Sequence, residues 1–227
     1  MGLNLEYIHV SKFYQGVPVL RDCSFTFPLG SSYAVMGPNG SGKSTLFRIG
    51  ALLEEPDRGE VRFSVGGQLL PQDLHLRRRV TMVFPRVGLF NRSVYQNVAY
   101  GLEIRGVGGR EQAAQVERVL ELVGLAAKKQ QHALTLSSGE AMRLGLARAL
   151  VIEPEVLFLD EPTTSLDPAN AGIIEDCLLR LRRERQMTLL LVTHDPAQAW
   201  RLGDALLRME NGRLVAADLI LPQECLT

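Results

Sequence analysis

The stretch Gly37-Pro38-Asn39-Gly40-Ser41-Gly42-Lys43-Ser44-Thr45 decides the fold of this chain, because it fits the pattern G-x-x-x-x-G-K-[ST]. An apolar run at 33–36 precedes it and a helix-like run beginning near Lys43 follows it, which is the strand, loop and helix context that the pattern requires. The glycines let the loop bend until successive backbone N–H groups point inward, and the positive end of the following helix points to the same place. The sequence therefore predicts a nest for polyphosphate.

Two side chains of this loop suit a phosphate ligand. Lys43 can reach the β- and γ-phosphates as a point charge, and the hydroxyl of Ser44 is placed to ligate Mg²⁺. The alternative is a glycine-rich turn that contains Lys-Ser by chance. The flanking strand and helix patterns favour the phosphate loop over that alternative.

A second stretch, Val156-Leu157-Phe158-Leu159-Asp160-Glu161-Pro162, places two acids after four apolar residues. This pattern is typical of a buried parallel strand whose carboxyl end emerges at the ligand-binding edge of an open sheet. Asp160 is then a candidate partner of Mg²⁺, direct or indirect, and Glu161 a candidate base that polarises an attacking water. Alternatively the two acids only begin a solvated loop, since strand ends often carry acids.

A third stretch, Leu136-Ser137-Ser138-Gly139-Glu140, contains the pattern of a capping box. Ser137 and Glu140, three residues apart, are predicted to start a helix whose body is 141–150, and the free N–H groups of that start form an anion site. A helix start with no phosphate of its own needs one from elsewhere. The simpler interpretation, a helix cap only, is compatible with this one because the same geometry serves both.

In this order the motifs resemble those of the ATP-binding-cassette (ABC) ATPases, and the resemblance runs along nearly the whole chain. Leu136 to Glu140 resembles the family signature, with Ser138 where glycine is more usual and Glu140 where glutamine is more usual. Tyr14 is similar to the aromatic residue that stacks on adenine, with Phe13 as the alternative. Further likenesses are the loop that contacts the second subunit, Ser165-Leu166-Asp167-Pro168, and the switch histidine, Thr193-His194-Asp195.

The resemblance implies ATP and Mg²⁺ as cofactors and a homodimer that sandwiches two ATP molecules. It implies catalytic roles for Lys43, Glu161 and His194, and metal binding by Ser44 and Asp160. The γ-phosphate would be held across the dimer by the signature of the other subunit. The implied nucleotide-binding residues are Tyr14, Gly37, Pro38, Asn39, Gly40, Ser41, Gly42, Lys43, Ser44, Thr45, Ser137, Gly139 and Glu140.

The predicted fold class is α/β, a P-loop NTPase with a RecA-like core and an antiparallel β subdomain, plus an inserted α-helical signature subdomain. The whole of 1–227 is expected to form one domain, with the core at 1–85 and 151–227 and the helical part at 86–150. Strands are expected near 3–8, 23–27, 32–36 and 60–63, where they would build the nucleotide-facing sheet edge, and again at 188–192; helical spacing marks 110–123 and 173–181.

Composition agrees with a folded, water-soluble subunit. The chain has 227 residues, 46% of them hydrophobic, and its 25 basic and 25 acidic residues balance, so no bulk field recruits nucleic acid. Cys23, Cys177 and Cys225 are far apart and outside any C-x-x-C pairing, which favours a reducing cytoplasm. No stretch reaches the roughly 18 to 20 apolar residues that span a bilayer, so other chains must cross the membrane if this one serves transport. The resemblance implies a protein that is peripheral on the cytoplasmic face of the cell membrane.

The segments 77–84 and 89–102 resemble the importer branch of the family, and the wording Phe90-Asn91-Arg92-Ser93-Val94-Tyr95 is most similar to tungstate-type oxyanion importers. The resemblance thus implies an integral-membrane permease as partner and, indirectly, a solute-binding protein. The alternatives are a cytosolic cassette ATPase not linked to transport, and a slow or inactive nucleotide-binding scaffold. The second alternative rests on Pro85, which stands where the family usually places a glutamine that contacts Mg²⁺ and the attacking water.

Overall fold

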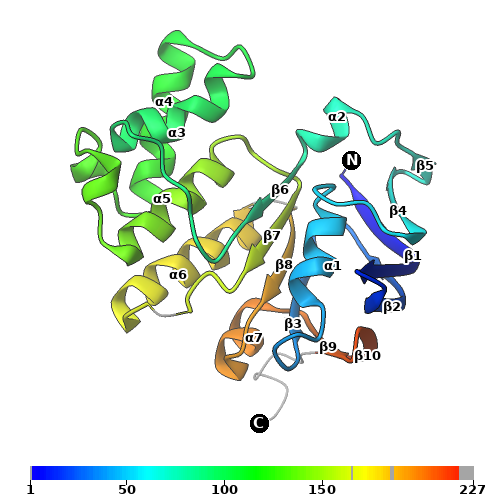
Figure 1. Cartoon of the computed structure of the whole chain (residues 1–227). Coiled ribbons are helices and arrows are strands. Elements are labelled where there is room, and N and C mark those ends of the chain that lie inside the picture. Colours follow the sequence, from blue (N-terminus) through cyan, green and yellow to red (C-terminus); the bar gives the residue numbers. More distant parts are fainter. Residues whose placement is uncertain (1, 165, 185–186, 220–227) are drawn as a thin grey trace.

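Parallel strands form the centre of the molecule, as expected from the run of apolar segments. The computed structural model describes residues 2–164, 166–184 and 187–219. In these, a six-stranded sheet has the order β10-β9-β3-β8-β7-β6, in which only β10 runs antiparallel to its neighbour (Figure 1). Its strands are β3 (Ser32–Met36), β6 (Val80–Val83), β7 (Val156–Asp160), β8 (Thr188–Val192), β9 (Ala205–Glu210) and β10 (Arg213–Leu219).

The two middle strands explain why this sheet is parallel and central. Every residue of β7 and of β8 is buried, so both strands are covered on both faces. A continuous apolar run is what such a strand needs, whereas a half-exposed strand would alternate. The predicted strands at 156–160 and 188–192 are therefore confirmed.

A second, antiparallel sheet has the order β2-β1-β4-β5. Its strands are β1 (Asn4–Tyr14), β2 (Val17–Phe27), β4 (Arg58–Val65) and β5 (Gln68–Leu69). The expectation that 32–36 joins these strands at one sheet edge is wrong, because β3 pairs with β8 and β9 in the other sheet. The burial patterns give the reason: β1 alternates between buried and partly exposed residues along its first half, while β3 is covered on both faces at Ala34 and Val35.

Helix α1 (Lys43–Gly50) lies between the two sheets (Figure 1) and joins their cores. Its Phe47 packs edge-on against Phe158 of β7, with ring centroids 5.2 Å apart, and Tyr7 of β1 donates a hydrogen bond to the carbonyl of Leu46. The phosphate loop, which directly precedes α1, is therefore anchored from both sheets.

The remaining helices divide between the sheet faces and a separate helical layer (Figure 1). Helices α6 (Pro168–Glu184) and α7 (Pro196–Leu202) follow β7 and β8, and α2 (Leu74–Arg77) precedes β6. The segment predicted to be helical contains α3 (Val94–Glu103), α4 (Gly109–Leu122) and α5 (Ser138–Leu150), with short 3-10 turns η1 (Ala126–Lys128) and η2 (Ala133–Thr135). The subdomain boundaries at 85/86 and 150/151 stay a prediction.

Two further findings concern the cysteines and the helices. Cys23 and Cys177 are buried free thiols, and Cys225 lies outside the described residues. Among the helices within 2–164, 166–184 and 187–219, none is long and apolar enough to cross a membrane.

The packing of α1 yields a test of the fold. A Cβ at Gly50 would lie 1.8 Å from the hydroxyl of Tyr7 and 2.8 Å from Phe158, so Gly50→Ala should lower the free energy of unfolding by about 1–3 kcal/mol. At Gly172, inside α6, an added Cβ would meet none of the described atoms within 4 Å. Gly172→Ala should therefore raise stability, by about 0.5–1 kcal/mol. Urea unfolding of both variants checks the contrast; changes of the same sign would contradict it.

Candidate functional site

The phosphate loop requires glycine at defined positions for steric reasons. Gly37 and Gly42 have φ of +156° and +102°, and Gly40 has φ of +77°. A Cβ at Gly37 would lie 2.0 Å from the carbonyl of Met209, and one at Gly42 would lie 2.7 Å from the carbonyl of Val19. Any other residue would thus force the loop off the neighbouring strands, and the predicted nest would open.

Lys43, the first residue of α1, lies over this loop and not in solvent. Its Nζ donates hydrogen bonds to the carbonyls of Gly37 (2.9 Å) and Pro38 (3.0 Å). Burial lowers the pKa of Lys43, and the nearby charges of Glu161 and Asp160 act in the opposite direction. A phosphate in the nest would therefore meet a positive charge that the loop already holds in place.

Asp160 ends β7 and presents an unusual oxygen. The residue is 3% exposed, and within the described part of the chain its Oδ1 is buried without a hydrogen-bond partner. Burial raises the pKa of Asp160, while a hydrogen bond with Ser44 opposes that rise. A buried, unpartnered carboxylate oxygen next to a hydroxyl is the donor chemistry that Mg²⁺ takes. The residues present thus fit this ion.

The protein alone does not complete a metal shell here. In the residues that the structure describes, no group of three or more His, Cys, Asp and Glu side chains is arranged to hold a metal. Mg²⁺ is commonly held by one or two protein oxygens, with waters and substrate phosphates supplying the rest. Ser44 and Asp160 could supply the two protein oxygens of such a site.

Glu161 and His194 meet because β7 and β8 are neighbours whose carboxyl ends share one edge. The Nε2 atom of His194 and Oε1 of Glu161 are hydrogen-bonded at 2.8 Å. Glu161 has φ of +52°, a left-handed backbone conformation that costs energy in a non-glycine residue, and its N–H donates to the carbonyl of Val192 (3.1 Å). Strain of this kind is often found where a side chain must be aimed.

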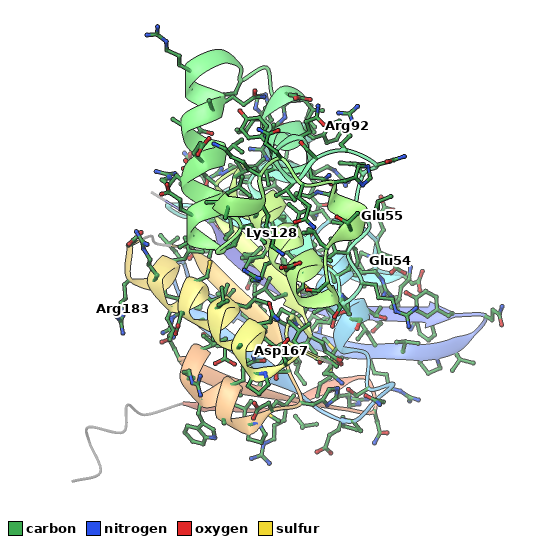
Figure 2. The ribbon with its side chains drawn as sticks, turned by 90° about the vertical axis from the view of Figure 1, so that its left-hand side faces the viewer. Glu54, Glu55, Arg92, Lys128, Asp167 and Arg183 are labelled. Atoms are coloured by element: carbon green, nitrogen blue, oxygen red, sulfur yellow. The ribbon has the colours of Figure 1, made fainter. Side chains whose placement is uncertain are left out.

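The predicted capping box is confirmed at the start of α5. The Ser137 hydroxyl accepts from the N–H of Glu140, and the Glu140 carboxylate accepts from the N–H of Ser137. The other carboxylate oxygen of Glu140 is hydrogen-bonded to Lys128, which holds the pKa of Glu140 below its usual range. Figure 2 shows Lys128 on the same side of the molecule as Asp167, near the start of α6. Lys128 gave no signal in the sequence, where it is one lysine among several.

The same helix start is tied to α6. A Cβ at Gly139 would lie 2.4 Å from Cγ of Asn170, so the glycine permits a close approach. Asn170 is in turn held by Asp167, which accepts from its backbone N–H at 2.9 Å and from its side-chain amide at 2.6 Å. The stretch 165–168 was singled out from the sequence; its Ser165 lies outside the described residues, but Asp167 caps α6 beside the signature.

The two aromatic residues at the end of β1 differ in exposure. Tyr14 is 39% exposed, and its hydroxyl donates to Glu54 (2.6 Å) and accepts from Arg48 (3.0 Å). The ring of Phe13 is only partly exposed and faces the guanidinium of Arg58, at 5.6 Å from the ring centroid. Of the two rings, Tyr14 is thus the more accessible to a base.

Pro85 follows β6 in an exposed loop and lines a cavity of about 430 Å³. The cavity lies between this loop, the start of α5 and the loop after Glu161; its other lining residues are Arg86, Val87, Ser138, Ala141, Met142, Thr164 and Leu166. Proline presents neither a side-chain amide nor a backbone N–H to that space. The side chain of Pro85 therefore offers no hydrogen-bonding or metal-binding atom to this cavity.

Comparisons with known proteins agree with this geometry. Residues 20–164 match the family model described as ABC transporter. A tungstate uptake system ATP-binding protein of Peptoclostridium acidaminophilum is 38% identical over 216 residues, which cover 95% of this chain and 99% of the relative. A phosphate import ATP-binding protein of Natronomonas pharaonis is 39% identical (92% and 77% covered), and a methionine import ATP-binding protein of Thermobifida fusca is 43% identical (93% and 68% covered).

Solved structures give the same result for the fold. A dimeric ATP-binding cassette in a post-hydrolysis state with ADP and Pi has a TM-score of 0.86 at 25% identity, and the match covers 96% of this chain and 99% of that one. The protein cbiO1 of Clostridium perfringens, part of an ABC transporter complex, has a TM-score of 0.84 at 29% identity, with 100% and 91% covered. The predicted P-loop NTPase fold is confirmed.

The pair of Lys128 and Glu140 yields a pH-dependent test. Lys128→Met should raise the pKa of Glu140 toward its ordinary value, because the donor that favours the carboxylate is gone. The ion pair with Lys128 stabilises the fold at pH values above the ordinary glutamate pKa, and this stabilisation is lost as the pH falls through the lowered pKa of Glu140. The Lys128→Met variant should therefore lose less stability on acidification than the unmodified chain. The neighbouring Lys129, which pairs with Glu117, is the matched control. Carbon-13 NMR titration of Glu140 decides: equal pKa values in both variants would contradict the assignment.

Proposed function

The chain belongs to the ABC transporter family, and we propose that it is the ATP-hydrolysing subunit of an importer. One observation carries the proposal. The phosphate loop with Lys43, the unpartnered oxygen of Asp160, and the hydrogen-bonded pair Glu161 and His194 converge where β3, β7 and β8 end. Relatives named as import ATP-binding proteins for phosphate, tungstate and methionine support the importer assignment.

We assign the nucleotide to this edge as follows. The phosphates lie in the nest formed by 37–45, where Lys43 exchanges its two carbonyl partners for phosphate oxygens. Ser44 and Asp160 would hold Mg²⁺, which would neutralise charge on the phosphates. Tyr14 stacks on the adenine ring, since base stacking needs an accessible aromatic face.

Glu161 is the proposed general base. His194 occupies one oxygen, Oε1, and fixes the carboxylate, so we assign the other oxygen, Oε2, to the proton of the attacking water. The proton leaves the water as its oxygen attacks the γ-phosphorus, and the bond to the β-phosphate oxygen breaks. Because the carboxylate is already oriented, little reorganisation is needed when a nucleotide arrives.

A second copy of the chain completes the site. The N-terminus of α5, with Ser137, Gly139 and Glu140, would take the γ-phosphate bound by the other copy. Glu140 would place a negative charge beside that anion, and Lys128 compensates it. The dimeric cassette with ADP and Pi supports this arrangement.

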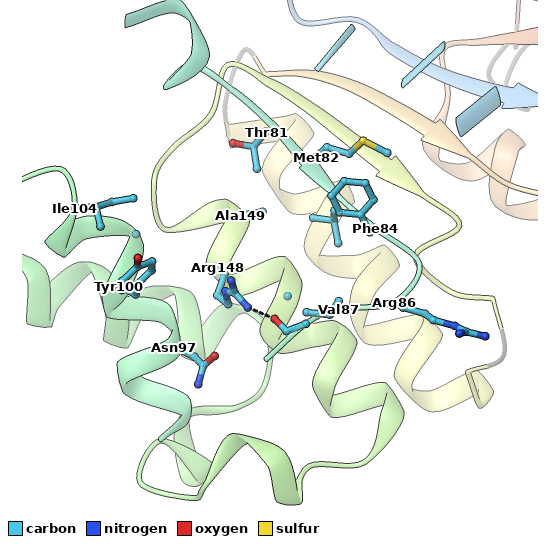
Figure 3. A pocket seen from close by; sticks show the side chains of 14 residues that line it. Thr81, Met82, Phe84, Arg86, Val87, Asn97, Tyr100, Ile104, Arg148 and Ala149 are labelled. Atoms are coloured by element: carbon cyan, nitrogen blue, oxygen red, sulfur yellow. Dashed lines mark hydrogen bonds between the residues drawn. The ribbon is translucent and has the colours of Figure 1, made fainter. Parts of the chain in front are cut away.

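The permease is proposed to dock on a cavity of about 350 Å³ between β6, α3 and α5 (Figure 3). Three large apolar side chains at its rim are exposed to solvent: Phe84 (42% exposed), Tyr100 (36%) and Ile104 (61%). Exposed apolar patches of this kind mark surfaces that bind other proteins. Arg148 reaches across to Gly88 and lies over the ring of Phe90, 4.4 Å from its centroid. Arg148 therefore holds the loop after Pro85 against α5. Because this contact lies beside the proposed docking surface, a docked permease could displace the loop.

The cargo is proposed to be an oxyanion, tungstate or a relative, captured outside by a solute-binding protein. The tungstate and phosphate relatives support an oxyanion, while the methionine relative shows that similar cassettes serve other solutes. In this proposal the chain lies on the cytoplasmic face of the membrane. Pro85 favours one second candidate, a cassette that binds ATP but turns it over slowly or not at all.

The first test is Glu161→Gln. The amide keeps the shape of the side chain and cannot accept the proton, so phosphate release should fall by about 10²- to 10⁴-fold while ATP binding persists and a dimer is trapped. Glu155→Gln, at the opposite end of β7 and paired with Arg79, is the matched control. Phosphate release and gel filtration with ATP and Mg²⁺ check both. A monomeric Glu161→Gln variant that hydrolyses ATP normally would refute the proposal.

The second test is Pro85→Gln. Steady-state phosphate release should rise, because the glutamine would supply an amide oxygen that could contact Mg²⁺ and the attacking water, which proline cannot. The measurement uses saturating ATP and Mg²⁺ with the permease present. A rate equal to or below that of the unmodified chain would contradict the role of Pro85. No hydrolysis by either form would favour the scaffold.

A further inference from the structure

A buried polar network lies behind the catalytic edge, between α6, α7 and the loop after Glu161. Its centre is Gln198 of α7, which is 2% exposed. The side-chain Nε2 of Gln198 donates to Oγ1 of Thr163 (2.7 Å) and to Oε1 of Glu175 (2.9 Å). Glu175, on α6, is 6% exposed, and its second oxygen accepts from Arg201 of α7. None of these residues belongs to the nucleotide site described above.

The chemistry of this network fixes which way the glutamine amide points. One oxygen of Glu175 accepts from Arg201, and the other accepts from Gln198, which turns its NH₂ group toward Glu175. The same NH₂ group then donates to Thr163, which also acts as acceptor. As a consequence, Oε1 of Gln198 is left buried without a partner among the described residues. The side-chain amide of Gln198 is thus buried with only its NH₂ group hydrogen-bonded. This indicates that the two hydrogen bonds of the NH₂ group have a function.

The position of Thr163 indicates what the hydrogen bond from Gln198 does. The segment 161–163 is held by the segment 192–198 at three successive points. The N–H of Glu161 donates to the carbonyl of Val192, the side chain of Glu161 pairs with His194, and the hydroxyl of Thr163 accepts from Gln198. The backbone of Glu161 has the left-handed conformation, and it lies between the contact with Val192 and the contact of Thr163 with Gln198. A strained residue keeps its conformation only when its surroundings hold it from both sides.

We propose that Gln198, oriented by Glu175, is a positioning residue for Glu161. Through Thr163 it holds the strained loop so that the carboxylate stays aligned with His194 and with the water it activates. The proposal rests on the function proposed above for Glu161. It also explains why Glu175 of α6 is buried against Gln198 and Arg201 of α7, the helix that follows His194.

The experiment compares Thr163→Val, Thr163→Ser and Gln198→Met. Thr163→Val removes the hydroxyl at constant volume, and Gln198→Met removes the donor at similar length. Each should lower kcat for phosphate release by about tenfold, since a small misplacement of a reacting group costs up to about a hundredfold. KM for ATP should stay within about twofold, because the nest around Lys43 is untouched. Thr163→Ser should retain the unmodified kcat.

A double variant separates positioning from general destabilisation. If both residues act through one hydrogen bond, Thr163→Val with Gln198→Met should be no slower than either single variant. Gln72→Met is the matched control, because Gln72 also donates from Nε2, to the carbonyl of Val61 (2.8 Å), far from this loop. Its kcat should not change. Should Gln198→Met fail to fold, Thr163→Val, which leaves Glu175 its partners, still decides.

A measurement that does not depend on ATP hydrolysis tests the positioning role of Gln198 separately from the proposed function. Amide hydrogen exchange of 161–164, measured without nucleotide, should quicken in Thr163→Val and Gln198→Met and not in Gln72→Met. An unmodified chain that releases no phosphate would refute the proposed function, and the exchange result would then decide the network. Normal kcat together with unchanged exchange in both variants overturns the positioning role.

Discussion

Parallel pairing of β3, β8 and β7 is the constraint on which the rest of this structure depends. Val192 is the register partner of both Val35 and Asp160, so the three strands end at one level. The phosphate loop, Glu161 and His194 each begin within two residues of those ends, and they meet for that reason alone. A shift of one register position would separate the loop from the carboxylates and turn the buried faces of these strands over.

Some of the buried polar atoms without hydrogen-bond partners in the described part of the chain lie at that edge. Oδ1 of Asp160 and Oγ of Ser41 are buried without partners among the described residues, and Lys43 uses carbonyls of its own loop as partners. A buried polar atom without a partner costs about 1–3 kcal/mol, so a fold keeps such atoms only where the packed core offsets them. The same groups are complementary to a phosphate and its cation, and a ligand would relieve the cost.

The helical layer contributes a second set of groups by different means. The capping box that starts α5 is a local device, whereas its placement depends on the close approach of Gly139 to Asn170 at the start of α6. On its other side α5 holds the loop after Pro85 through Arg148. One helix is therefore in contact with the loop after Pro85 and with the helix that follows Glu161.

The sequence by itself determined the elements whose physics is local. Glycine spacing at 37–42, the apolar runs at 156–160 and 188–192, and the capping box at Ser137 and Glu140 each depend on neighbours in the chain, and the structure confirms them. Only the tertiary structure decided that β3 pairs within the parallel sheet and not with the N-terminal strands. It also decided that Lys128 pairs with Glu140, and that Gln198 is hydrogen-bonded to both Thr163 and Glu175. These contacts join residues that are distant in the chain or lie in different elements, and one lysine or glutamine carries no sign in its own surroundings of the partner that folding brings to it.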